Sequence, residues 1–306
     1  MKHFLNLNEL STEDLKGILK QAQEMKDARV GLPKGTIDKN QPLHQHIVAL
    51  VFEKPSTRTR TSFDVGVRQL GGQPMVLSGA EMQLGQGESI ADTARVLSRY
   101  VDLIMIRTFD SDTLYELAKY STVPIINGLT NESHPCQIMA DLQTMIDCHG
   151  PLEGQRVTWL GDGNNVLVSW IEASAVFKFE LRIACPDGYS PPADILAWAR
   201  AQGGDITLHD DPVEAARNSQ TLVTDVWISM GDVEGTRTQD FAPYQVNADL
   251  MKVASADSVF MHCLPAIRGQ EVAAEVIDGP QSVVFDEAEN RLHAQKAVLA
   301  WCFAGN

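Results

Sequence analysis

Paired cysteines are missing from this sequence. Its 306 residues contain five cysteines, and no two of them have the CxxC spacing of a redox or metal site. An odd number of cysteines in a long chain argues against a disulfide framework and favours a reducing compartment. The first residues, Met1 to Phe4, lead directly into polar sequence, so no secretory leader is expected. These absences predict a cytoplasmic protein.

Long apolar runs and an excess of positive charge are missing as well. No run approaches the roughly 18 apolar residues that a membrane-spanning helix needs. Lys and Arg number 25 against 40 Asp and Glu, for a net charge of −15. Such a chain repels polyanions at long range, so neither a membrane nor nucleic acid is expected as a partner. A small anionic ligand is still compatible with this charge where a few basic side chains converge.

The sequence does contain a repeated alternation of short apolar runs and helical patterns. Four strands are predicted in the first half of the chain, at residues 46–52, 74–77, 103–106 and 123–126. Five follow in the second half, at residues 157–160, 181–184, 206–208, 221–224 and 259–261. This order is typical of parallel sheets with helices on both faces. The predicted fold class is therefore α/β, with two doubly wound domains.

The segment GPLEG at residues 150–154 marks the expected boundary between these domains, since it is rich in turn-forming residues. We expect a first domain of residues 1–134 and 287–306, a second of residues 150–286, and a linking helix over 135–149. The last amphipathic helix, predicted at residues 287–303, then packs back on the first domain. Residues 225–244 lack helical periodicity and are predicted to form a long polar loop.

Polar residues directly follow two predicted strands of the first domain. Ser56 to Ser62 (STRTRTS) comes after the strand 46–52, where a helix begins. A helix start offers free backbone N–H groups and the positive end of the helix dipole, to which hydroxyl and guanidinium groups add donors. Arg107 follows the strand 103–106, and the carboxyl ends of parallel strands meet at one edge. These residues predict an anion-binding site, although a well-capped surface helix has the same pattern.

His134 and Gln137 lie one helical turn apart at the start of the predicted linking helix. An imidazole can donate to a carbonyl oxygen, and a Gln amide can bind an NH2 group. This pair therefore suits a carboxamide-like ligand. The alternative for His134 is a structural role at the helix start.

The turn GDGNN, residues 161–165, resembles a dinucleotide-binding turn, but Val166 stands at the third glycine position. An NAD-dependent oxidoreductase is therefore a rival function, and a plain tight turn is the structural alternative. The two Asn side chains are better suited to hydrogen bonds with a carboxylate or an amine.

Two further segments follow strands of the second domain. DVWISMG places Asp225 at a strand end, where its carboxylate suits a substrate ammonium group, and Ser229 and Met230 in a segment that can close over it. HCLP places Cys263 at the next strand end, as a small core residue or a reactive thiol. A metal shared by His262 and Cys263 is not expected, because adjacent residues of a strand point to opposite faces.

The motifs occur together in an order that covers residues 5–301. They are FEKPSTRTRTSF, EMQLGQGESIADTARVLSRY, MIRT, HPCQIMADL, GDGNN, DVWISMG, HCLPA and VFDEAENRLHAQKAVL. In this combination the sequence resembles the ornithine carbamoyltransferases. STRTR with HPxQ is shared by the wider superfamily, which includes the aspartate carbamoyltransferases, whereas DxxxSMG and HCLP favour ornithine as the acceptor.

The resemblance implies which residues bind the two substrates. Those for carbamoyl phosphate are Ser56, Thr57, Arg58, Thr59, Gln83, Arg107, His134, Gln137 and Arg291, with Gln83 supplied by a neighbouring subunit. Those for L-ornithine are Asn165, Asp225, Ser229, Met230, Cys263 and Leu264. The implied catalytic residues are Arg107, His134, Gln137, Asp225 and Cys263. The family also implies a homotrimer with sites at subunit interfaces, and neither a metal nor another cofactor.

The implied reaction is direct attack of the neutral ornithine amine on the carbonyl carbon of carbamoyl phosphate. It gives L-citrulline and phosphate without a covalent enzyme intermediate. Negative charge develops on the carbonyl oxygen, and Arg107, His134 and Thr59 are the candidates to stabilise it. Val168 and Ile267 depart from the family pattern, where histidines are frequent. The alternatives are an N-acylated ornithine or another diamine as the acceptor, and a ligand-binding homologue without activity.

Overall fold

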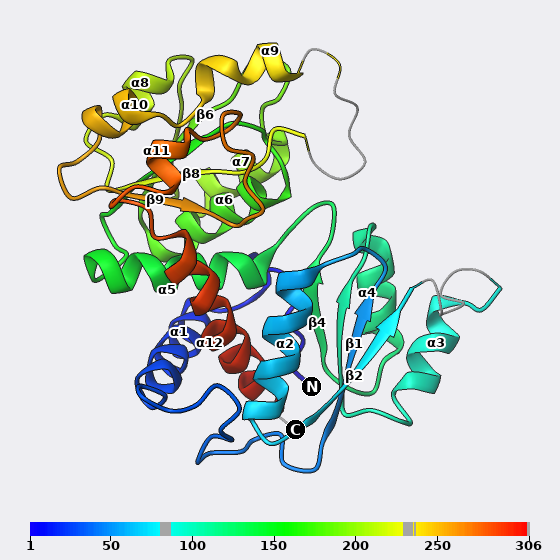
Figure 1. The fold of residues 1–306 in the computed structure, drawn as a ribbon. Coiled ribbons are helices and arrows are strands. Elements are labelled where there is room, and N and C mark those ends of the chain that lie inside the picture. The colour runs from blue at the N-terminus through cyan, green and yellow to red at the C-terminus, as the bar shows by residue number, and fades with distance from the viewer. Residues whose placement is uncertain (80–86, 229–234, 236, 305–306) are drawn as a thin grey trace. The chain divides into compact units, whose positions relative to one another are not determined.

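The computed structural model describes residues 1–79, 87–228, 235 and 237–304. Helices and strands alternate along the chain, which divides into two compact units (Figure 1). The first contains residues 1–140 and 289–306, and the second contains residues 141–288. Two helices, α5 (Pro135–His149) and α12 (Val284–Phe303), carry the chain from one unit to the other. The domain boundaries drawn from the sequence stay a prediction.

The sheet of the first unit is parallel and has the strand order β2-β1-β3-β4. Its strands are β1 (Ile47–Phe52), β2 (Gln73–Ser78), β3 (Leu103–Arg107) and β4 (Ile125–Leu129). Besides parts of α5 and α12, its helices are η1 (Leu7–Glu9), α1 (Thr12–Asp27), α2 (Thr57–Gln69), α3 (Ile90–Leu97) and α4 (Ser111–Tyr120). The chain places β2 on one side of β1 and then returns to place β3 on the other. Strands β1 and β3 therefore flank a topological switch point, where ligands of open α/β sheets bind.

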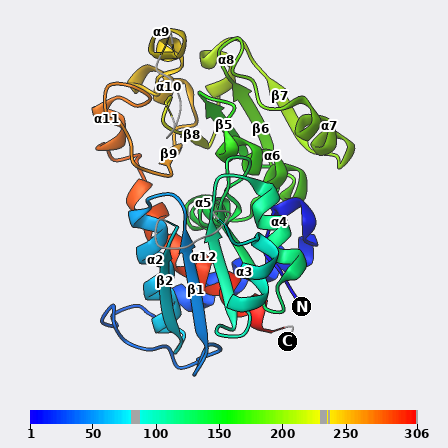
Figure 2. The ribbon, with the colours of Figure 1, turned by 90° about the vertical axis from the view of Figure 1, so that its right-hand side faces the viewer.

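Helices cover both faces of this sheet, which explains why its inner strands are apolar up to Arg107 at the end of β3. Strand β1 reads IVALVF and is buried from Val48 to Phe52. Ala49 and Val51 belong to a core cluster with residues of α3 and α4, whereas α2 and α12 lie on the opposite face (Figures 1 and 2). Strands that are buried on both faces lose the alternation of apolar and polar residues.

The last helix packs on the first unit, as the sequence predicts. Trp301 Nε1 of α12 donates a hydrogen bond of 3.0 Å to Asp14 of α1. The fully buried Lys296 donates to Gln69 over 3.1 Å and pairs with Asp38 at 2.5 Å. Helix α12 has 20 residues, yet no helix in the described part of the chain is apolar enough over such a length to cross a membrane.

The sheet of the second unit is also parallel and has the order β7-β6-β5-β8-β9. Its strands are β5 (Arg156–Leu160), β6 (Glu180–Ala184), β7 (Asp205–Leu208), β8 (Thr221–Thr224) and β9 (Val259–His262). Its longer helices are α6 (Asn165–Phe177) and α7 (Ala193–Ala201). Here the strand order reverses between β5 and β8, which makes that pair a second switch point. The two sheets confirm the predicted fold class of two doubly wound α/β units.

The sequence-based prediction was wrong in the second unit where helices are short. Residues 225–244, predicted as one loop, contain α9 (Arg237–Phe241) and the 3-10 turn η2 (Ala242–Tyr244). Three helices were not predicted at all, namely α8 (Pro212–Ala216), α10 (Ala248–Val253) and α11 (Ala274–Ile277). With five, six and four residues, they are too short for a periodic pattern to show, and packing rather than propensity stabilises them.

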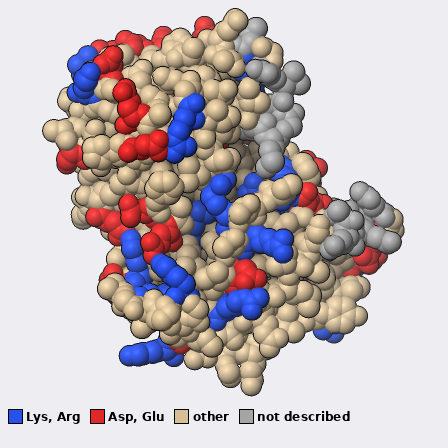
Figure 3. All heavy atoms as spheres, in the orientation of Figure 1, with Lys and Arg blue, Asp and Glu red and all other residues tan. Residues whose placement is uncertain are grey.

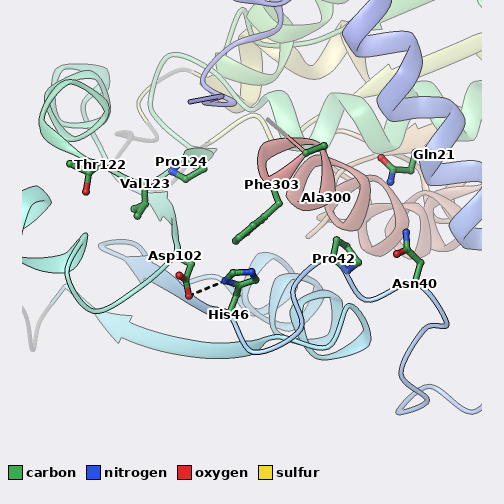
Figure 4. A pocket seen from close by; sticks show the side chains of 11 residues that line it. Gln21, Asn40, Pro42, His46, Asp102, Thr122, Val123, Pro124, Ala300 and Phe303 are labelled. Carbon is green, nitrogen blue, oxygen red and sulfur yellow. Dashed lines mark ion pairs between the residues drawn. The ribbon is translucent and has the colours of Figure 1, made fainter. Parts of the chain in front are cut away.

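A pocket of about 710 Å³ lies at the amino-terminal ends of β1 and β3 (Figure 4). His46 Nδ1 lies 3.4 Å from Asp102 Oδ2 in its wall, and the ring of Phe303 lies 4.8 Å from that of His46. The predicted anion site follows the carboxyl ends of the same strands. This pocket is therefore at the opposite edge of the sheet from the residues considered next.

Candidate active site

The switch point of the first unit brings Arg107 beside the start of α2. Phe52 at the end of β1 is in register with Arg107 at the end of β3. Ser56 is the N-cap residue of α2, and Thr57, Arg58 and Thr59 form its first turn. Arg107 is 9% exposed, and its Nη1 donates to Thr59 Oγ1 over 3.4 Å. Basic side chains gather around this end of α2 on the face shown in Figure 3, although the chain is acidic overall.

Arg291 of α12 reaches the same cluster from the far end of the sequence. Its Nη2 donates to Thr59 Oγ1 over 2.8 Å, and its Nη1 donates to Gln137 Oε1. All three side chains are buried. Because the Thr59 oxygen accepts from both Arg291 and Arg107, the hydroxyl proton is directed toward another acceptor. The hydrogen bonds to Thr59 and Gln137 therefore hold the guanidinium groups of Arg107 and Arg291 in fixed positions.

His134 lies just before α5 and is 5% exposed. Its burial, followed by the charges of nearby guanidinium groups, holds the pKa of His134 well below its usual value. Those groups belong to Arg291, Arg107 and Arg58. The imidazole is therefore neutral near pH 7, and it can donate one hydrogen bond without adding a charge.

Lys54 also belongs to this edge, although the sequence did not indicate it as a site residue. The Lys54 ammonium is hydrogen-bonded to Asn131 and lies 4.4 Å from the ring centroid of Phe109. Burial and the neighbouring Arg107 lower the pKa of Lys54. A lysine directly after a buried strand is the signal that could have indicated this residue.

The switch point of the second unit brings Asp225 beside the start of α6. Asn164 is the N-cap of α6, and its Oδ1 accepts from the backbone N–H of Val166 at 3.0 Å and of Leu167 at 3.2 Å. Its Nδ2 donates to Asp225 Oδ2 over 2.8 Å. Asn165, which the resemblance assigns to ornithine, is the first residue of the helix. The carboxylate of Asp225 is thus held at a helix N-terminus, where negative charge is favoured.

Cys263 faces the same carboxylate from the end of β9. Its Sγ donates to Asp225 Oδ1 over 3.2 Å. Burial of the sulfur, then the charges of Asp225 and Glu287, raise the pKa of the Cys263 thiol well above its usual value. At neutral pH the group is a thiol that donates a hydrogen bond, not a reactive thiolate. Leu264, the next residue, has a left-handed φ of 57°.

Two buried residues that the sequence did not indicate hold this turn. His262 Nδ1 accepts from the Leu264 backbone N–H at 2.8 Å, so the ring proton is on Nε2. Nε2 then donates to Glu271 Oε1 at 3.3 Å, and the same oxygen accepts from Ile267 N–H at 2.5 Å. His262 and Glu271 are both fully buried. They position Cys263 and Leu264 through the backbone.

The expectation that His262 and Cys263 could not share a metal ion was based on a wrong premise. Ligand atoms of these two residues and Asp225 all lie within 4.8 Å of one another. Cys263 follows the end of β9, so the alternation of a strand does not separate it from His262. Both ring nitrogens of His262 are engaged, with Leu264 and Glu271, and the thiol is protonated. A metal would have to displace these bonds and that proton.

The GDG turn does not offer the open glycine that a dinucleotide needs. A Cβ atom on Gly163 would lie 2.5 Å from backbone atoms of Tyr189, Ser190 and Pro191. The chain itself therefore occupies the position where a pyrophosphate approaches the second glycine of a dinucleotide fingerprint. This packing argues against the rival oxidoreductase function.

Three predicted site residues and the two departures from the family pattern lie outside the contacts described so far. Gln83, Ser229 and Met230 lie outside the described residues. Val168 is half-buried in α6, and Ile267 is 44% exposed beyond the HCLP turn. Neither of these two departures from the family pattern contacts Asp225 or Cys263 in the hydrogen bonds described above.

Comparison with known proteins agrees with a separate ligand site in each unit. Residues 2–147 match the family model described as the aspartate/ornithine carbamoyltransferase carbamoyl-P binding domain. Residues 153–302 match the Asp/Orn binding domain of the same family. Fold and site thus define a carbamoyltransferase, and the chain belongs to the aspartate/ornithine carbamoyltransferase family.

Individual relatives narrow the comparison. The chain is 55% identical over 307 residues to an ornithine carbamoyltransferase of Roseobacter denitrificans, covering 99% of this chain and 100% of the relative. It is 57% identical over 303 residues to one of Bradyrhizobium diazoefficiens, covering 99% and 97%. Among solved structures, the ornithine carbamoyltransferase of Pyrococcus furiosus superimposes with a TM-score of 0.94 at 46% identity, covering 100% and 98%.

Proposed function

We propose that the protein transfers the carbamoyl group of carbamoyl phosphate to the side-chain amine of L-ornithine, giving L-citrulline and phosphate. The observation that carries the proposal is the donor cluster of the first unit. There Arg107 and Arg291 converge on Thr59 beside a neutral His134, within the part of the chain that matches a carbamoyl-P binding domain.

The phosphate group is bound by the start of α2 and the basic side chains around it. The free N–H groups of the first helical turn and the guanidinium of Arg58 suit a doubly charged phosphate. Arg107 bridges the phosphate and the carbonyl oxygen. The oxygen of Gln137, which accepts from Arg291, is the acceptor for the carbamoyl NH2.

The reaction places negative charge on the carbonyl oxygen when the amine attacks. Arg107, Thr59 and His134 donate to that oxygen, and each such donor contributes roughly 3 kcal/mol to stabilising the transition state. A neutral His134 acts here only as a donor, because its depressed pKa keeps it from taking up a proton at pH 7. The leaving phosphate is already an anion and needs no covalent help from the protein.

Ornithine is bound by the second unit. Asp225 accepts from Asn164, Cys263 and the Val226 backbone N–H, and its negative charge suits an ammonium group of the substrate. The amine that attacks has a pKa like that of Lys, about 10.4, and must lose a proton first. Asp225 and Cys263 position this amine, and an oxygen of the phosphate is the candidate for final proton acceptor. Asn165, Ser229, Met230 and Leu264 complete the ornithine site.

The assembly that we propose rests on the resemblance, and the cytoplasmic location rests on the composition of the chain. A homotrimer would let Gln83 of a neighbouring subunit complete the carbamoyl phosphate site. A reducing cytoplasm suits a chain in which all five cysteines are free.

The test is a colorimetric assay of carbamoylated product with several acceptors in parallel. L-Ornithine, N-acetylornithine, putrescine and L-aspartate are each mixed with carbamoyl phosphate and the purified protein. We expect the highest kcat/KM with L-ornithine. A higher kcat/KM with N-acetylornithine or putrescine would show that this compound, and not L-ornithine, is the acceptor. If none of the four acceptors gives a product, the protein is a ligand-binding homologue without activity.

A further inference from the structure

Arg237 occupies a position that the proposed reaction does not explain. It is the first residue of α9, and its Nη1 donates to the Trp227 carbonyl oxygen over 2.8 Å. The same nitrogen donates to Asp162 Oδ2 over 3.1 Å. The side chains of Arg237 and Asp162 are only 20% and 13% exposed. The guanidinium is thus a largely buried bridge between two segments of the chain.

These two segments follow the strands that flank the switch point of the second unit. Asp162 lies in the turn after β5, and Trp227 lies in the segment after β8 that begins with Asp225. Asn164 already connects the same turn to the same segment through its bond to Asp225. Asp225 therefore lies in a segment held at two points, one on its carboxylate and one on the backbone two residues further on.

Aromatic rings enclose the guanidinium of Arg237. Its central carbon lies 5.0 Å from the ring centroid of Tyr189 and 5.9 Å from that of Phe241. The ring of Phe241 in turn lies 6.0 Å from that of Trp227 in a stacked arrangement. A flat guanidinium can bind a carboxylate and a carbonyl while it lies against aromatic faces, whereas an ammonium group cannot match this shape.

We propose that Arg237 is a positioning residue for the acceptor. It holds the Asp225 segment against the GDGN turn and so keeps the Asp225 carboxylate in the orientation that binds ornithine. Arg237 does not contact the substrate itself. The inference rests on the proposed function, since it concerns the same ornithine site. It predicts a defect in ornithine binding with the carbamoyl phosphate site intact, because the contacts of Arg237 described here are all within the second unit.

The test compares Arg237→Gln and Arg237→Lys with the control Arg217→Gln. Arg217 forms an exposed ion pair with Glu214 in the same unit and has no contact with the Asp225 segment in that pair. We expect Arg237→Gln to raise the KM for ornithine about 10- to 100-fold, the range for losing a hydrogen bond to a charged group. Arg237→Lys should lie between this variant and the wild type, because it keeps the charge but not the planar fork.

Three measurements distinguish a positioning role of Arg237 from a general loss of folding stability. The KM for carbamoyl phosphate and the melting temperature of Arg237→Lys should stay at the wild-type values, and so should every parameter of Arg217→Gln. Ornithine affinity is also measured by calorimetry in the presence of a phosphonate analogue of carbamoyl phosphate, which does not need turnover. It should fall in both Arg237 variants.

Two results would overturn the inference. One is an Arg237→Gln protein with wild-type ornithine affinity. The other is an equal rise in both KM values together with a lower melting temperature in both variants, which would indicate a structural role. An inactive wild-type protein that still binds ornithine less tightly after Arg237→Gln would refute the proposed transfer while supporting the positioning role.

Discussion

The two units of this protein share one sheet topology but carry side chains of opposite charge at the switch point. Each has a parallel sheet whose strand order reverses once, between β1 and β3 in the first and between β5 and β8 in the second. At the first switch point stand Arg58, Arg107 and a neutral His134. At the second stands Asp225, which accepts from the neutral groups of Asn164, Cys263 and the Val226 backbone. The fold therefore determines where a ligand binds, and a few side chains determine which ligand it is.

The half-sites also differ in how their side chains are held. In the first unit, β3, α2, α5 and α12 each contribute one side chain to a shared network around Thr59 and Gln137. In the second unit, the side chains are held mainly by backbone groups close in sequence, such as the cap of α6 and the turn after β9. Substitutions in the first network should therefore act on several elements at once.

The largest effect is expected from removing charge at the first switch point. Arg58→Gln should lower turnover at fixed carbamoyl phosphate about 100- to 1,000-fold, because a charged donor to the phosphate is lost. Initial rates at varied carbamoyl phosphate measure it. Arg60→Gln, an exposed residue of the same helix, is the matched control. If Arg58→Gln and Arg60→Gln lower turnover equally, Arg58 has no specific role at the first switch point.

A smaller effect is expected from neutralising the carboxylate of the second switch point. Asp225→Asn should raise the KM for ornithine about 10- to 100-fold with the KM for carbamoyl phosphate unchanged, because hydrogen bonds to a charged group are lost. Steady-state kinetics with each substrate varied in turn separates the two constants. The exposed Asp249→Asn serves as the control. An unchanged ornithine KM would remove Asp225 from the acceptor site.

The buried pair beneath Cys263 should have a moderate effect. Glu271→Leu leaves the His262 Nε2–H and the Ile267 N–H without their acceptor, and kcat should fall roughly tenfold as the turn shifts. Glu271→Gln keeps an acceptor oxygen and should recover most of the activity. The exposed Glu275→Gln should have no effect. If the Leu and Gln variants are equally active, the pair does not position the turn.

The smallest effect that we expect is a loss of folding stability at acidic pH, which arises from a histidine of the first unit. His293 is buried, and its burial and the nearby Lys296 lower its pKa to about 4. The unfolded chain takes up this proton below about pH 6.5, whereas the folded chain does so only near pH 4. Stability therefore falls as the pH drops through this window, by about 2 kcal/mol at pH 5 relative to pH 8.

Urea unfolding at pH 8 and pH 5 measures this loss. His293→Gln should reduce the difference between the two pH values, and the exposed His44→Gln should leave it unchanged. His134 has a depressed pKa as well and contributes in the same direction. A wild-type protein that is equally stable at both pH values would contradict the assignment of two neutral buried imidazoles to the first unit.

Strand ends explain what could be predicted from the sequence. Once apolar runs alternate with helices, parallel sheets follow, and residues just after each strand are brought to one edge. That argument alone points to Arg107 at the end of β3 and Asp225 after β8. It works because it needs only local patterns and one rule of topology.

What the sequence could not provide depends on contacts between distant residues. Arg291 and Thr59 are 232 positions apart, and only the family resemblance connected them. The hydrogen bond between His262 and Glu271 could not be predicted from the sequence, because a single acidic residue in a polar segment is common. The sequence indicated both Asn side chains of the GDGNN turn but not that Asn164 is the one that bonds to Asp225, and the assignment of Asn165 to ornithine stays a prediction. Adjacent residues of the same type are distinguished only by the direction of their side chains.

The return of α12 to the first unit has a consequence for the order in which the protein matures on the ribosome. Arg291 is translated after every strand of the second unit, yet it joins a network whose other members belong to the first. A nascent chain that contains all four strands of the first sheet still lacks the Arg291 guanidinium of this network. The carbamoyl phosphate site proposed above would therefore be complete only after the second unit has been synthesised.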